Sequence, residues 1–91
     1  MAKVKIKMYA TIREKFKEGE VELDAETVID AIRKLVEKYP ILKNEVLDEN
    51  DSLKNDYIYL VNGRNVEFLQ KGNTSLKDGD KISIFPPVAG G

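Results

Sequence analysis

The closing segment Phe85-Pro86-Pro87-Val88-Ala89-Gly90-Gly91 is the part of the chain whose residue types best suit chemistry. Its two prolines disfavour helix formation and strand pairing, so they project the chain outward. The side chains after them shrink to none, and a glycine backbone can be gripped closely from all sides. Extended, this segment reaches roughly 20 Å. The pattern predicts a thin carrier whose reactive group is the α-carboxylate of Gly91, which is inert until adenylation by ATP supplies a leaving group.

Other chemistry is poorly supported. The chain has no Cys and no His, which excludes Cys nucleophiles, disulfides, His-based acid–base steps and most zinc sites. Acidic clusters occur at Asp48-Glu49 with Asp51 and at Asp78 with Asp80. An EF-hand loop starting at Asp48 fails because Leu53 stands where glycine is needed, and both clusters are typical of turns. The sequence predicts no metal site.

Composition narrows the class of protein. A chain of 91 residues favours one small domain, which we place at residues 1–85, with a flexible tail at 86–91. Lys plus Arg (15) nearly equals Asp plus Glu (16), so no basic excess indicates a nucleic-acid or membrane partner. We find no secretory signal and no apolar run that could span a bilayer, and we expect a cytoplasmic protein.

Alternating residues predict two strands near the start of the chain. Val4, Ile6 and Met8 share one face and three lysines the other; at 20–24, Val21 and Leu23 alternate with acidic residues. The opposed charges predict an antiparallel hairpin. Between these strands, the spacing of Ile12 and Phe16 indicates a short helical turn over 10–16.

A helix is predicted from Thr27 to Tyr39, with an apolar stripe at a period of 3.6 and Pro40 as its stop. A short second helix is expected at 41–47. Strands are predicted at 57–61, at 66–69 after the Asn62-Gly63 turn, and around Ile82 and Ile84. These elements favour an α+β fold of the β-grasp kind: a mixed sheet of about five strands, its first and last strands parallel at the centre, with one main helix packed on one face.

The sheet face away from that helix would be open. If Ile58, Leu60, Ile82 and Ile84 face the helix, the residues of opposite parity line the open face: Tyr57, Tyr59, Val61 and Phe85. Long lysine and arginine stems could cover such residues. We favour a partner-binding patch that includes Tyr57, Tyr59 and Phe85.

Two segments carry a resemblance to a known family. Tyr9-Ala10-Thr11-Ile12-Arg13-Glu14 is similar to an aromatic-Ala-x-Leu-Arg-Glu motif, and the more specific stretch runs from Leu76 to the Phe-Pro-Pro-Val-x-Gly-Gly ending. On these motifs the chain resembles the MoaD-type small subunit of molybdopterin synthase, a sulfur carrier of the MoaD/ThiS superfamily. The resemblance spans nearly the full length.

The resemblance implies a mechanism. An E1-like enzyme would adenylate the Gly91 carboxylate with ATP, and sulfur would replace the AMP to give a thiocarboxylate. The tail would then enter the large synthase subunit, in an expected heterotetramer, and donate sulfur to molybdopterin. Gly90 would allow passage, while Phe85, Pro86, Pro87, Val88 and Ala89 position the tail. The chain would hold no permanent cofactor and would not be catalytic by itself.

Three alternatives stay open. Archaeal proteins of this type can also be protein modifiers, joined through the terminal carboxylate to lysines of other proteins. A thiamin-type sulfur carrier is a further option, although such carriers are usually shorter and lack the Pro-Pro ending. A β-grasp adaptor with incidental glycines belongs to a different class. Both the carrier and the modifier begin with the same adenylate, so the tail does not separate them.

Overall fold

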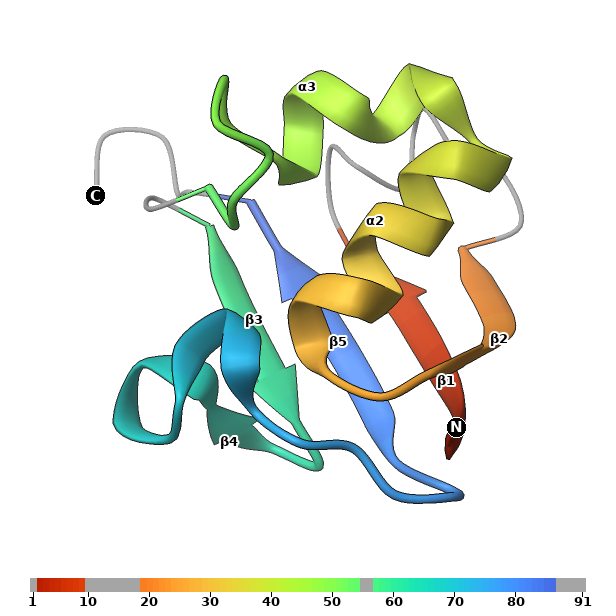
Figure 1. Ribbon diagram of the computed structural model, residues 1–91, viewed down its shortest axis with the longest axis vertical. Helices are drawn as coiled ribbons and strands as arrows, with labels where there is room; N and C mark the ends of the chain where they lie inside the picture. Colours follow the sequence, from red (N-terminus) through yellow and green to blue (C-terminus); the bar gives the residue numbers. More distant parts are fainter. Residues whose placement is uncertain (1, 10–18, 55–56, 87–91) are drawn as a thin grey trace.

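A single mixed sheet with helices on one side forms the domain (Figure 1). The computed structural model describes residues 2–9, 19–54 and 57–86. The strand order is β2-β1-β5-β3-β4, with β1 and β5 parallel and the other neighbours antiparallel. The strands are β1 (Ala2–Met8), β2 (Glu20–Ala25), β3 (Ile58–Val61), β4 (Arg64–Asn65) and β5 (Lys81–Phe85). The predicted β-grasp architecture, with its first and last strands paired in parallel, is therefore confirmed.

The hairpin of β1 and β2 has the register that its charges predict. Lys3 lies opposite Asp24, Lys5 opposite Glu22, and Lys7 opposite Glu20. Cross-strand pairs of opposite charge each contribute about 0.2–1 kcal/mol. A shift of one residue would turn Val4, Ile6 and Met8 out of the core, so apolar burial fixes the register far more strongly than the charges do.

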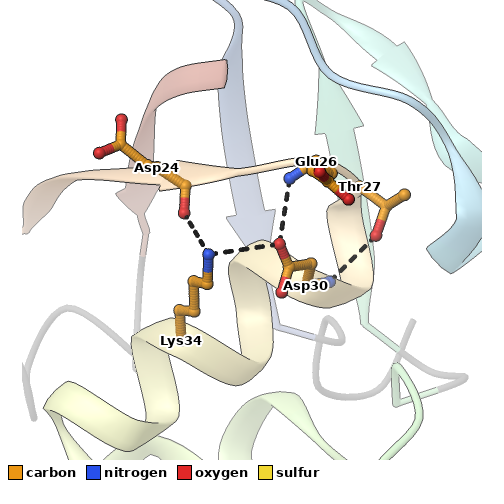
Figure 2. Close-up of polar contacts among 5 residues, drawn as sticks. All are labelled: Asp24, Glu26, Thr27, Asp30 and Lys34. Carbon is orange, nitrogen blue, oxygen red and sulfur yellow. Dashed lines mark hydrogen bonds and ion pairs between the residues drawn. The ribbon is translucent and has the colours of Figure 1, made fainter. Parts of the chain in front are cut away.

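Helix α2 (Val28–Lys38) begins at a side-chain cap. Thr27 has an extended backbone, and its hydroxyl accepts a hydrogen bond from the Asp30 amide at 3.2 Å. The Asp30 carboxylate reaches back and accepts from the Glu26 amide at 3.0 Å, one residue earlier than in the usual capping box (Figure 2). Lys34 lies 3.5 Å from the same carboxylate and donates to the Asp24 carbonyl at 2.9 Å. Together these bonds join the helix to β2.

The apolar stripe of α2 packs on the sheet. Val28, Ala31, Ile32 and Leu35 are fully buried, while Val36 and Tyr39 pack at the margin. After Pro40 a 3-10 turn, η1 (Pro40–Leu42), leads into the short helix α3 (Lys43–Val46), which confirms the second helix predicted at 41–47. The helical turn predicted at 10–16 lies outside the described residues.

The strand predicted at 66–69 is wrong. Asn62 and Gly63 do form the predicted turn, with φ of 53° and 86°. However, β4 ends at Asn65, whose side chain accepts a hydrogen bond from the Glu67 amide at 2.9 Å. That bond caps the 3-10 turn η2 (Val66–Phe68), and a second turn, η3 (Lys71–Asn73), follows. A local side-chain bond thus competes successfully with continued strand pairing.

The predicted orientation of β3 is also wrong. Tyr59 pairs with Ile84 and Val61 with Ile82, and residues directly opposite in a sheet share a face. Tyr59 is only 2% exposed, so it belongs to the core, whereas Ile58 and Leu60 face away from α2. The Tyr59 hydroxyl donates to the Val46 carbonyl at 2.7 Å and accepts from the Lys54 amide at 3.3 Å. These two bonds satisfy the Tyr59 hydroxyl inside the core. The alternation of residues alone would place the neighbours Ile58 and Leu60 in the core instead.

Replacing the buried hydroxyl should test this orientation. We expect Tyr59→Phe to lower the free energy of unfolding by about 1 kcal/mol, because the Val46 carbonyl and the Lys54 amide each lose a hydrogen bond to this hydroxyl and keep only the 3.4 Å bond between them. Urea unfolding followed by circular dichroism measures the change. Ile58→Thr, on the open face, is the control and should stay within about 0.5 kcal/mol of the native chain. Equal effects of the two variants would contradict the buried position of Tyr59.

Candidate functional site at the root of the tail

The predicted tail leaves the sheet from its central strand. The ring of Phe85, the last residue of β5, stacks on Tyr9 with centroids 4.4 Å apart and ring planes 14° from parallel. The Tyr9 amide donates to the Ile84 carbonyl at 3.2 Å, and Ile58 lies opposite Phe85 on β3. Both neighbouring strands therefore hold the point of departure. Pro86, just beyond it, is half-buried.

The rest of the predicted site lies outside the described residues. Pro87, Val88, Ala89, Gly90 and Gly91 are in this part of the chain. Their assigned roles in activation and positioning stay predictions. What the structure does place is Phe85 and Pro86, at the end of a strand that pairs on both sides.

An apolar patch surrounds this root on the face opposite α2. We call Tyr9, Ile58, Leu60 and Phe85 the root patch. Ile58 is 41% exposed, and the other three side chains are half-buried. Lys7, whose ammonium lies 5.4 Å from the Tyr9 ring centroid, borders it. A surface with an aromatic and aliphatic centre and cations at its margin is suited to binding another protein.

Of the four residues predicted to line the open face, the root patch contains Phe85 alone, because Tyr59 and Val61 are buried. Phe85 lies where its parity indicated, but Tyr59 is buried and Ile58 takes its place. Tyr57 also belongs to the helix side, where its hydroxyl donates to the Glu45 carboxylate at 2.7 Å. The apolar residues Ile58 and Leu60 gave no signal of exposure, because β3 carries large apolar or aromatic residues on both faces.

The acidic clusters are turn-forming, as predicted. The Asp48 carboxylate accepts hydrogen bonds from the amides of Asn50 and Ser52. Asp78 accepts from the Lys3 amide, and Asp80 from the Lys77 amide and the Asn62 side chain. Within residues 2–9, 19–54 and 57–86, no three His, Cys, Asp or Glu side chains gather as metal ligands. Over the same ranges, none of the helices is both long and apolar enough to cross a membrane.

A β-grasp sheet with an apolar face at the root of a Gly-Gly tail defines a ubiquitin-like domain. The chain belongs to the ThiS family, whose profile it matches over residues 6–91. It is 35% identical over 91 residues to small archaeal modifier protein 3 of Haloferax volcanii, covering 97% of this chain and 98% of that one. It is also 33% identical over 90 residues to a protein of Archaeoglobus fulgidus that is named as a proposed sulfur carrier. That match covers 97% of this chain and 98% of the relative.

The solved structures agree with this family. The solution structure of small archaeal modifier protein 1 from Methanosarcina acetivorans superposes with a TM-score of 0.91. It is 40% identical, and the match covers 100% of this chain and 98% of that one. The family of ubiquitin-like modifiers and sulfur carriers is thus established, and the predicted restriction to molybdopterin synthase is narrower than these relatives support.

The stacked pair at the tail root should be energetically coupled. In a double-mutant cycle of Tyr9→Ala and Phe85→Ala, we expect a coupling of about 0.5–1.5 kcal/mol, since stacked rings interact beyond their buried area. Urea unfolding of the four proteins gives the value. A second cycle that combines Tyr9→Ala with Phe68→Ala, on η2, should be additive within about 0.5 kcal/mol. Additivity in the first cycle would mean that the stack does not anchor the root.

Proposed function

We propose that this chain is a ubiquitin-like protein modifier, activated at the carboxyl group of Gly91 and joined to lysine side chains of other proteins. The observation that carries the proposal is its similarity, over nearly the whole chain, to small archaeal modifier proteins. The Gly90-Gly91 ending supports it, because a tail without side chains suits passage through a narrow active site. The fold supplies the root patch as a surface for the activating enzyme.

The chemistry proceeds in two steps. An E1-like enzyme would attach AMP from ATP to the Gly91 carboxylate and release pyrophosphate. A lysine amine of the target would then attack the activated carbonyl carbon, which forms an isopeptide bond and expels the leaving group. No permanently bound cofactor is needed on this chain. Its own contribution is to present the tail from a rigid strand end held by Tyr9 and Ile58.

A second candidate is sulfur carriage. The relative from Archaeoglobus fulgidus and the family itself favour it, together with the Phe-Pro-Pro-Val-x-Gly-Gly ending. In this case a sulfide-level nucleophile would attack the carbonyl carbon of the adenylate, form a C–S bond and expel AMP, and the resulting thiocarboxylate would serve a sulfur-accepting partner. The large subunit of molybdopterin synthase is the partner that the ending implies. Because the adenylate is common to both routes, one protein can serve in both.

Mass spectrometry of the protein from its own cells separates these fates. If the chain is a modifier, tryptic digests of larger species should contain target lysines branched to its terminal glycines. If it is a sulfur carrier, the free chain should gain the mass of one sulfur in place of one oxygen, at Gly91. Detection of both species would establish both routes. Neither species, even after incubation with ATP and the native activating enzyme, would reject the proposal in favour of an adaptor.

Two variants complete this experiment. Deletion of Gly90 and Gly91 should abolish ATP-dependent adenylation and every conjugate, while the melting temperature stays unchanged because the tail begins beyond β5. Ile58→Asp in the root patch should weaken adenylation by raising the KM of the activating enzyme for this chain. The matched control is Ile41→Asp, since Ile41 is also exposed (65%) but lies on η1. Equal kinetics for the two isoleucine variants would exclude the root patch from the contact.

A further inference from the structure

A second concave surface lies away from the root patch. It has a volume of about 440 Å³ and is bounded by α2, the segment at 52–54, the start of β3, and the turns η2 and η3. Ile29, Leu53, Tyr57 and Val66 give it apolar walls, and backbone and polar side chains complete the lining. This volume falls in the range of sites that bind small molecules or a few residues of peptide. We call it the helix-side pocket.

The charges around the helix-side pocket are unbalanced. Among its described lining residues, Arg33, Lys54 and Lys71 are cationic and Glu67 is the one acid. Arg33 donates twice to the Asp51 carbonyl, at 3.0 and 3.1 Å, and Lys54 donates to the Asn44 carbonyl at 2.5 Å. These acceptors are backbone carbonyl groups, which orient the two cations and carry no formal charge. On the open face, by contrast, the lysines of β1 lie opposite the acids of β2.

The turns that frame this pocket are held in one shape. The Thr74 side chain, in a residue only 8% exposed, donates to the Lys71 carbonyl at 2.7 Å and accepts from the Gln70 amide at 3.1 Å. Lys71 has a φ of 51°, in the left-handed region that a lysine rarely occupies. Gly72 packs against Ile29, where an added Cβ would lie 3.1 Å from the isoleucine Cβ. The pocket wall is therefore preorganised, which lowers the entropic cost of binding.

An exposed aromatic residue adjoins the pocket. Phe68 follows the lining residue Glu67 on η2 and is 87% exposed, more than Ile41 at 65%. Leu69 beside it is 37% exposed. Aromatic residues held outward on a fixed backbone are frequent anchors of protein interfaces. Phe68 and Leu69 stand in the chain between the lining residues Glu67 and Gln70, so an exposed apolar pair interrupts the part of the chain that lines the pocket.

We propose that the helix-side pocket, with Phe68 at its edge, binds an acidic peptide segment of a partner protein that carries an apolar side chain between its carboxylates. The apolar side chain would lie against Ile29, Leu53 and Val66, and the carboxylates would face Arg33 and Lys71. Among the described residues that line the pocket, three cations stand against one acid, on a chain whose net charge is −1, and this local excess favours an acidic partner. This binding is separate from the chemistry at Gly91, so either proposal can fail alone.

Nuclear magnetic resonance titration of the full-length chain tests the proposal. The probe is an acetylated, amidated hexapeptide, Asp-Glu-Leu-Phe-Glu-Asp. We expect amide shifts at Ile29, Leu53 and Gly72, weakened by added salt, with no shifts at Lys5 or Ser83 on the open face. Two control peptides replace either the acids by lysine or the Leu-Phe pair by serine, and both should bind more weakly. Shifts confined to the open face, or none at all, would overturn the proposal.

Matched charge variants sharpen the result. Lys71→Asn removes a cation but suits a positive φ, so the fold should persist; we expect about two- to five-fold weaker binding. Lys77→Asn makes the same exchange at an exposed residue outside the pocket and should leave affinity unchanged. Phe68→Ser should weaken binding of the hexapeptide. Equal affinities of the hexapeptide for the native chain, Lys71→Asn and Phe68→Ser would refute the site. Free glutamate that caused the same shifts as the hexapeptide at the same concentration would also refute it, because the pocket would then be a small-anion site only.

Discussion

The parallel pairing of β1 with β5 is the constraint on which the rest of this structure depends. The two strands are the first and last of the described elements, yet they meet at the centre of the sheet. Ile6 and Ile82, and Met8 and Ile84, are paired neighbours that are fully buried beneath α2. Because β5 is bonded on both sides, its end is fixed in position. The root of the tail is fixed with it, so the segment that follows Phe85 starts from a defined point on the sheet.

The two faces of the sheet differ in exposure because the helices cover only one of them (Figure 1). On the covered side, α2 contributes its apolar stripe, and Tyr59 connects β3 to the backbone of α3. On the other side, opposed charges occupy the β1–β2 end, and the root patch occupies the end where the tail departs. Apolar and charged areas of one face are thereby separated across the sheet, from β2 to β3. An activating enzyme of the kind proposed above would find an apolar contact beside the tail root and a charged area that orients its approach.

The sequence predicts most of the fold because its periodic segments are long. The alternation in β1 and the stripe of α2 each present one apolar face, so their burial follows directly. The orientation and the ends of short elements are harder to predict from the sequence. In β3 both faces carry large apolar or aromatic residues, and only its register with β5 and the distant Val46 carbonyl decide that Tyr59 faces inward. The end of β4 depends on one side-chain bond from Asn65, which no hydrophobic pattern reveals. For the candidate site, Phe85 was predictable from its parity, whereas Ile58 was not.

The hydrogen bond from Lys34 to the Asp24 carbonyl affects how the edge of the sheet can pair with other chains. Strand β2 is an edge strand, and an edge with unpaired backbone groups can recruit a strand from another chain. The Lys34 ammonium occupies the Asp24 carbonyl on that strand and is held there by Asp30, which also caps the helix. An incoming strand could pair with the Asp24 carbonyl only after it displaced the Lys34 ammonium from that carbonyl and from the Asp30 carboxylate. The contact that starts the helix therefore also makes it less favourable for a further strand to pair with β2 at Asp24.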